Sequence, residues 1–223
     1  MCSTGRPRLQ ATCLERLANE GGLFTDGALA RAPRVYLAGE PSIGAAWIRS
    51  VFDVVELAPG RPHLPSFWRV FEDAAGGVPL LFLENDVWIV RDGIPRVAEL
   101  ADELPADAGL VTLFDFRNES NGQRWQQLDS ARAFWGTQAV LFSPAAVEAL
   151  GQLAREKRAF DSFDSWDVWS GLAVAHAKLG LYLHAPSLVQ HLGARSEVWP
   201  ERPWVPRATN FPESIPEPLD VDG

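Results

Sequence analysis

The segment from Leu81 to Val87 reads Leu-Phe-Leu-Glu-Asn-Asp-Val and places carboxylates directly after an apolar run. Residues 78–83 predict a central strand covered on both faces, and ligands of open α/β sheets bind at the carboxyl ends of strands. Ionised carboxylates beside such a run need a partner. One partner is a Mg²⁺ or Mn²⁺ ion held by Asp86, alone or with Glu84, because both metals prefer oxygen ligands. The alternative is that Asp86 only caps the turn after the strand.

A second acidic cluster lies between Asp161 and Asp167, at the start of a helix predicted for residues 166–179. A carboxylate in the first turn of a helix is stabilised by the helix dipole, which gives a purely structural explanation. The chemical explanation is a general base that removes a proton from an attacking hydroxyl. We expect Asp167 to be this base, with Asp164 as the second candidate.

His191 follows an extended run at residues 187–190. A neutral imidazole is a good ligand for Mn²⁺, so His191 is a second candidate metal ligand. The alternative is a core histidine satisfied by a backbone carbonyl. His63, His176 and His184 have no comparable sequence context, and we interpret them as structural or surface residues.

Short apolar strands alternate with helices along the chain, which predicts an α/β domain with a mostly parallel sheet. The spacing of Leu64, Phe67, Trp68 and Phe71 predicts a helix over residues 64–75. Ser143 and Pro144 suit the N-cap and first position of a further helix. Strands are predicted at 34–38, 52–55, 109–114, 139–142 and 181–183, a further helix at 94–104 and a long loop at 118–129. The dense prolines of 194–223 exclude regular structure and predict a tail that wraps the domain or stays mobile.

The composition excludes several classes of protein. The chain of 223 residues has a formal net charge of −9 and a pI of about 4.9, which disfavours a broad nucleic-acid footprint. No apolar run reaches the ~20 residues that span a bilayer, and the first residues lack a secretory signal, so a cytoplasmic location is expected. Cys2 and Cys13 show no ligand spacing. Residues 39–44 have the glycine spacing of a P-loop, but the required lysine is missing.

Three motifs, in order, resemble GT-A-fold glycosyltransferases. Residues 81–87 resemble the LFLEDDV segment, a variant of the Asp-x-Asp motif of that family, with Asn85 where an acidic residue is common. Residues 135–143 are similar to a GTQAY-hydrophobic-Ser strand, and residues 186–193 resemble a PSLVQHIG segment. Residues 3–7 also look like the first-strand loop that receives the nucleotide.

The resemblance implies a single GT-A-type, Rossmann-like α/β domain over residues 1–193, with a mostly parallel central sheet flanked by helices. Its nucleotide half would span about 1–110 and its acceptor half 111–193, followed by the Pro-rich tail 194–223. It implies a hexosyl- or N-acetylhexosaminyl-transferase that uses a nucleotide sugar, with a UDP-sugar expected, together with Mn²⁺ or Mg²⁺. A base at Asp167 implies inversion at the anomeric carbon. The acceptor is a saccharide, a peptide or a small molecule, and a modified nucleic acid fits the acidic pI less well.

Residue roles follow from the resemblance. The expected metal ligands are Asp86 and His191, and the catalytic residues are Asp167 and Asp164. The expected donor-binding residues are Thr4, Arg6, Glu84 and Asn85. The expected substrate-binding residues are Trp135, Gly136, Thr137, Trp166 and Arg69. Core packing for the two tryptophans and a surface position for the two arginines are the alternatives. Two other functions stay open: a catalytically degenerate GT-A-like module that binds a glycan or a partner, and a sugar nucleotidyltransferase.

Overall fold

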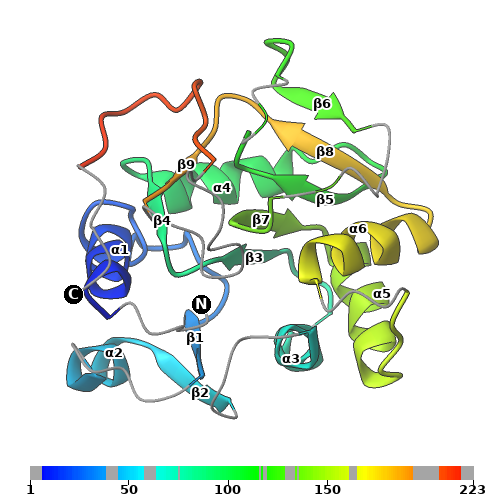
Figure 1. Cartoon of the computed structure of the whole chain (residues 1–223), viewed down its shortest axis with the longest axis horizontal. Coiled ribbons are helices and arrows are strands. Elements are labelled where there is room, and N and C mark those ends of the chain that lie inside the picture. Colours follow the sequence, from blue (N-terminus) through cyan, green and yellow to red (C-terminus); the bar gives the residue numbers. More distant parts are fainter. Residues whose placement is uncertain are drawn as a thin grey trace.

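The computed structural model describes residues 7–38, 45–57, 64–74, 76–115, 117, 120–128, 134, 136–160, 165–192 and 206–216. They form a mixed α/β fold (Figure 1). The helices are α1 (Pro7–Asn19), α2 (Ala45–Val51), α3 (Leu64–Asp73), α4 (Gly93–Asp102), α5 (Pro144–Arg155) and α6 (Trp166–His176). The strands are β1 (Arg34–Ala38), β2 (Asp53–Leu57), β3 (Leu80–Leu83), β4 (Val87–Ile89), β5 (Ala108–Thr112), β6 (Trp125–Gln127), β7 (Ala139–Phe142), β8 (Gly180–His184) and β9 (Val189–His191).

Five strands form a mixed sheet in the order β3-β7-β5-β8-β6. Strand β7 is antiparallel to both β3 and β5, β8 is parallel to β5, and β6 is antiparallel to β8. Every residue of β5 and β7 is buried. Their nearly unbroken apolar sequence fits this position, because a strand covered on both faces has no solvent side for polar residues.

Two smaller sheets complete the strand pairing. β1 is parallel to β2, with Arg34 opposite Asp53, and β4 is antiparallel to β9, with Val87 opposite His191. Within the described ranges only β1–β2 and β5–β8 are parallel pairs. The expected mostly parallel central sheet is therefore not confirmed. An apolar run reports burial on both faces but carries no information on strand direction.

The five-stranded sheet separates two hydrophobic layers. Along β7, Leu141 packs with the layer that contains residues of α1 and α4. Its neighbours Val140 and Phe142 pack with the layer that contains α3, α5 and α6. This alternation follows from the period of two along a strand. Figure 1 shows α1 on one side of the molecule and α5 and α6 on the other.

Several local predictions are confirmed. Leu64, Phe67, Trp68 and Phe71 are buried on α3, as their helical spacing indicated. Helix α5 begins after Ser143, whose hydroxyl accepts a hydrogen bond from the amide of Ala146 at 3.3 Å, with proline at the first helical position. None of the helices in the described ranges is both long and apolar enough to cross a membrane.

Other elements differ from the sequence-based expectation. Strand β6 lies inside the region predicted as a loop, and it pairs with β8 through Trp125 and His184. Helix α6 ends at His176, and Gly180 already belongs to β8. Helix α1 was not predicted, although Pro7 stands at its first position and its buried residues Leu9, Cys13 and Leu17 recur every four positions, which is helical spacing.

Residues 206–216 of the tail pack against the domain near β9 and α1 (Figure 1). The amide of Gln190 donates to the carbonyl of Ala208 at 2.8 Å and accepts from its backbone N–H at 3.0 Å. Glu213 accepts from the backbone N–H of Arg91 at 2.8 Å and from the guanidinium of Arg16 at 2.6 Å. These bonds tie the described part of the tail to the core, and the remaining residues of 194–223 lie outside the described ranges.

Candidate functional site

Glu84 directly follows β3 and extends the pairing of that strand, since its backbone N–H donates to the carbonyl of Gln138 at 2.9 Å. Its side chain turns toward the start of β7 and of α6. Oε1 accepts hydrogen bonds from the hydroxyl of Thr137 at 2.9 Å and from the indole N–H of Trp166 at 3.2 Å. Glu84 therefore joins three segments that are far apart in the sequence.

Asp86 and His191 meet across the β4–β9 ribbon. The backbone N–H of Leu192 donates to the carbonyl of Asp86 at 2.8 Å, which holds the ends of the two strands together. His191 Nε2 lies 3.0 Å from Asp86 Oδ2, with side-chain exposures of 10% and 14%. The other ring nitrogen of His191, Nδ1, is buried and has no hydrogen-bond partner within the described residues. The two residues expected to hold a metal are thus adjacent and nearly buried.

Asp167 lies in the first turn of α6 and binds backbone groups of a different segment. Its Oδ1 accepts hydrogen bonds from the amides of Gly136 at 2.9 Å and Thr137 at 2.8 Å. Ser165 occupies the N-cap position of the helix without a side-chain capping bond. Because Asp167 binds these two amides, favourable interaction with the helix dipole does not account for all of its contacts. Both amides bind the same oxygen, so Oδ2 is not engaged by them.

Gly136 gives the chain the conformation that presents the two successive amides. Its φ is +138°, in the region that favours glycine. A Cβ at this position would lie 3.1 Å from the hydroxyl oxygen of Thr112, which itself donates to the carbonyl of Gly136 at 3.1 Å. The glycine is therefore required by backbone geometry and by the neighbouring side chain together.

Two carboxyl groups of the cluster, those of Glu84 and Asp167, have raised pKa values. Burial, followed by the negative charges of Asp86 and Asp167, raises the pKa of Glu84 to about 8. Burial also raises the pKa of Asp167, and the two amide hydrogen bonds oppose this effect because they favour the charged form. Near neutral pH Glu84 therefore holds a proton. Raised pKa values in a polar cluster are typical of functional sites.

Asp86 and His191 offer a metal two protein ligands. Among the residues that the structure describes, no three His, Cys, Asp or Glu side chains gather in a geometry that could hold an ion. Mg²⁺ sites on nucleotide substrates use one or two carboxylates and take further ligands from phosphates and water, and imidazole suits Mn²⁺. The adjacent carboxylate and imidazole fit an ion of this kind, with the substrate completing its coordination.

The other expected site residues lie in four different kinds of place. Asn85 lies in the turn between β3 and β4. The ring of Trp166 packs 5.7 Å from Phe67, so it is part of the core as well as a donor to Glu84. Arg69 is exposed on α3 and forms an ion pair with Asp73 at 2.9 Å, so its described contacts are away from the cluster. Outside the described residues lie Thr4, Arg6, Trp135 and Asp164.

Two neighbours of Asp86 were not among the expected site residues. Burial raises the pKa of the Cys13 thiol, and the charge of Asp86 adds to this shift. Burial lowers the pKa of Arg207, and the charge of Asp86 opposes that shift. The guanidinium of Arg207 also donates to the carbonyl of Leu192 at 3.4 Å. No motif or spacing links these residues, because helix α1 and the tail reach Asp86 only through tertiary folding.

The fold and the site together define a mixed α/β protein with a carboxylate–histidine cluster after β3. No protein-family model matches the chain, and no curated protein sequence matches it. Among solved structures, the crystal structure of A197 from STIV aligns with a TM-score of 0.38 and 13% sequence identity, covering 83% of this chain and 98% of that chain. A likeness this weak carries no argument about function.

Proposed function

We propose that this protein is a metal-assisted glycosyltransferase that moves a sugar from a nucleotide-sugar donor to an acceptor hydroxyl. One observation carries the proposal, namely that Asp86 pairs with His191 while Glu84 and Asp167 meet at Thr137. A metal-assisted transfer needs a cation site and a separate general base, and the cluster supplies candidates for both. The resemblance of the segments that contain these residues to GT-A enzymes supports the same reaction.

Donor binding is assigned to the β4–β9 ribbon. Asp86 and His191 would hold Mn²⁺ or Mg²⁺, and the donor would be a UDP-sugar whose diphosphate completes the ligand set. The bound ion neutralises negative charge on the leaving diphosphate. The half-buried Arg207 adds a positive charge beside Asp86, which favours the same phosphate groups.

Acceptor activation is assigned to Asp167. Its carboxylate takes the proton of the acceptor hydroxyl while the acceptor oxygen forms a bond to the anomeric carbon. The bond from that carbon to the diphosphate oxygen breaks in the same displacement, and its electron pair leaves with the nucleoside diphosphate. The amides of Gly136 and Thr137 hold Oδ1 in place and leave Oδ2 for the proton. Attack from the face opposite the leaving group inverts the configuration at the anomeric carbon.

Glu84 and Asp167 take different protonation states in this mechanism. The pKa of Glu84 is raised to about 8 by burial and by the neighbouring carboxylates, so Glu84 is neutral near pH 7. Burial raises the pKa of Asp167 as well, but two backbone amide bonds stabilise its charged form and oppose that shift. When the environments of two carboxyl groups differ in this way, the difference in pKa assigns the acid and base roles. Here it favours Asp167 as the base.

A panel of nucleotides tests the donor site directly. The midpoint of thermal unfolding is measured with UDP, GDP, CMP and ADP, each with Mn²⁺ and with EDTA. A ligand at a hundredfold excess over its Kd stabilises the folded state by about 2.7 kcal/mol, so we expect a Mn²⁺-dependent rise with UDP. The rise should disappear in Asp86→Asn. No shift with any nucleotide in the presence of Mn²⁺ would contradict the proposal.

Assays of the reaction products distinguish the proposal from its two alternatives. Incubation with the donor that the panel selects should release nucleoside diphosphate and, with a suitable acceptor, form a glycoside of inverted configuration. Binding of the nucleotide without release from any donor would favour the degenerate binding module. Release of pyrophosphate from a nucleoside triphosphate and a sugar phosphate would favour the nucleotidyltransferase.

A further inference from the structure

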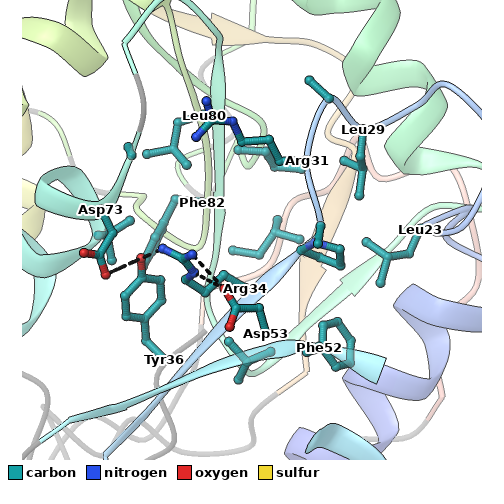
Figure 2. A pocket seen from close by; sticks show the side chains of 18 of the residues that line it. Leu23, Leu29, Arg31, Arg34, Tyr36, Phe52, Asp53, Asp73, Leu80 and Phe82 are labelled. Carbon is teal, nitrogen blue, oxygen red and sulfur yellow. Dashed lines mark hydrogen bonds and ion pairs between the residues drawn. The ribbon is translucent and has the colours of Figure 1, made fainter. Parts of the chain in front are cut away.

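A cavity of about 360 Å³ lies between residues 29–36 and strand β3 (Figure 2). Its volume is at the small end of the range of about 300–1,000 Å³ that is typical of ligand pockets. The lining comes from helix α1, from the chain before and along β1, and from all of β3. Strand β3 therefore separates this cavity from strand β7, which pairs with it in the sheet.

The inner wall of the cavity is apolar. Leu14, Leu23, Phe52, Phe82 and Ile94 line it, and each is at most 6% exposed. An apolar wall of this kind favours contact with apolar ligand atoms, because contact with it removes apolar surface from water. The part of a ligand that lies against this wall is accordingly expected to be a hydrocarbon.

One side of the cavity carries a compensated set of charges. The guanidinium of Arg34 pairs with Asp53 at 2.7 Å and with Asp73 at 3.7 Å, and Asp73 also pairs with Arg69 at 2.9 Å. The hydroxyl of Tyr36 donates to Asp73 at 3.4 Å, as Figure 2 shows. Arg69 also pairs with Glu72 at 3.8 Å, so the charged groups on this side of the cavity are already engaged with one another.

Arg31 differs from these residues. It is exposed at the rim of the cavity, and it forms no hydrogen bond or ion pair with any other described residue. In Figure 2 its side chain lies near Leu80, with no dashed line to it. The rim therefore presents one guanidinium that has no carboxylate partner among the described residues, next to an apolar interior. Charge complementarity selects a ligand with a negative group at one end.

The cavity is separate from the proposed donor and acceptor site. None of Glu84, Asp86, Asp167 and His191 lines it. Leu83 does line it, whereas the carboxylate of the next residue, Glu84, is bonded to Thr137 and Trp166. A ligand in the cavity would touch β3 without touching the carboxylate–histidine cluster.

We infer that this cavity binds a medium-chain aliphatic anion, with its hydrocarbon chain among the leucines and its negative group on Arg31. A volume of about 360 Å³ lies at the small end of the range for ligand pockets, so the cavity suits a medium-length chain and not a long lipid. A chain of about ten carbons with a terminal carboxylate or phosphate meets this size. The inference goes beyond the proposed transfer reaction and does not depend on it.

Isothermal titration of the full chain with three ten-carbon ligands tests the inference. Decanoate, decyl phosphate and decanol are compared below their micelle-forming concentrations. Binding of one equivalent is expected for the anions, and binding of decanol should be weaker by about two- to fivefold, the effect of one exposed charge pair. The tighter of the two anions identifies the head group. No binding of any of the three ligands to the folded protein would overturn the inference.

Variants locate the bound ligand. Arg31→Gln should remove the preference for the anions over decanol, whereas Arg96→Gln, an exposed arginine on α4, should leave it unchanged. Leu29→Trp and Val78→Trp each place a large side chain in the cavity and should abolish binding of decanoate. Far-UV circular dichroism and urea unfolding show which of the two cavity-filling variants stays folded. Unchanged decanoate binding in a folded cavity-filling variant, or loss of the preference in Arg96→Gln as well, would overturn the assignment.

Discussion

His191 Nε2 lies 3.0 Å from Asp86 Oδ2, and the two side chains are 10% and 14% exposed. The contact is set by the antiparallel pairing of β4 with β9, in which Val87 is opposite His191. A buried carboxylate needs a partner, and here the partner is an imidazole that itself can bind a cation. The same pair can therefore stabilise the free protein and bind a metal ion when a nucleotide is present.

Substitution of this pair should affect nucleotide binding in a coupled way. Asp86→Asn and His191→Gln should each weaken Mn²⁺-dependent UDP binding by about tenfold or more, a loss of about 1.4 kcal/mol. The double variant should bind about as weakly as either single variant, because both remove the same ion. Isothermal titration with and without EDTA measures the affinity of each variant for UDP. His176→Gln, an exposed histidine on α6, is the control, and additive losses would contradict a shared ion.

Asp167→Asn should slow catalysis without disturbing the fold. The amide oxygen of asparagine still accepts from the amides of Gly136 and Thr137, but the residue can no longer take a proton. Loss of a general base lowers kcat by about 10²- to 10⁴-fold, while the affinity for the nucleotide should stay within about twofold. Release of nucleoside diphosphate measures the rate, and titration measures the affinity. An unchanged kcat would show that another group is the base.

Stability should depend on pH through Glu84. The pKa of this carboxyl is about 8 in the folded protein, against an ordinary value of 4.5. The folded state thus binds more protons between these values, so the free energy of unfolding falls as pH rises from about 4.5 to 8. One such group contributes at most about 1.4 kcal/mol per pH unit.

The variant Glu84→Gln isolates this contribution. The decline of the free energy of unfolding between pH 5 and 8 should be smaller in Glu84→Gln than in the wild type, as measured by urea denaturation. Glu99→Gln, an exposed glutamate on α4, should keep the wild-type slope. A slope that is equal in wild type and Glu84→Gln would mean that Glu84 is ionised across this range.

The tail should contribute to stability through Glu213. This carboxylate binds the guanidinium of Arg16, whose side chain is 5% exposed, and the backbone N–H of Arg91. Glu213→Gln removes the negative charge from a pair whose glutamate side chain is 29% exposed, and it should cost about 1.5–3 kcal/mol, the usual contribution of a hydrogen bond to a charged group. Urea denaturation measures the loss.

The exposed pair between Arg124 and Glu103 supplies the control for the tail. Both side chains are 50% exposed, and exposed pairs contribute about 0–1 kcal/mol. Glu103→Gln should therefore change stability less than Glu213→Gln does. Equal effects of the two substitutions would mean that the contact of Glu213 stabilises the fold no more than an exposed ion pair does.

Local elements could be predicted from the sequence because their signals lie within a few residues. The apolar run at 139–142 coincides with β7, and Ser143 with Pro144 marked the start of α5. The helical spacing of Leu64 to Phe71 identified the buried face of α3. Strand direction could not be predicted in this way, so the mixed character of the sheet emerged only from the pairing.

The amino-acid sequence by itself determined which chemical groups follow β3, begin α6 and end β9, since each group is set by its local pattern. Only the tertiary structure decided which of them meet. Asp86 reaches His191 through the register of β4 and β9, and Asp167 reaches the amides of Gly136 and Thr137 because the first turn of α6 lies beside the residues that precede β7. Contacts of this kind depend on pairing between distant segments, whereas hydrophobic periodicity reports only the burial of each segment along its own length.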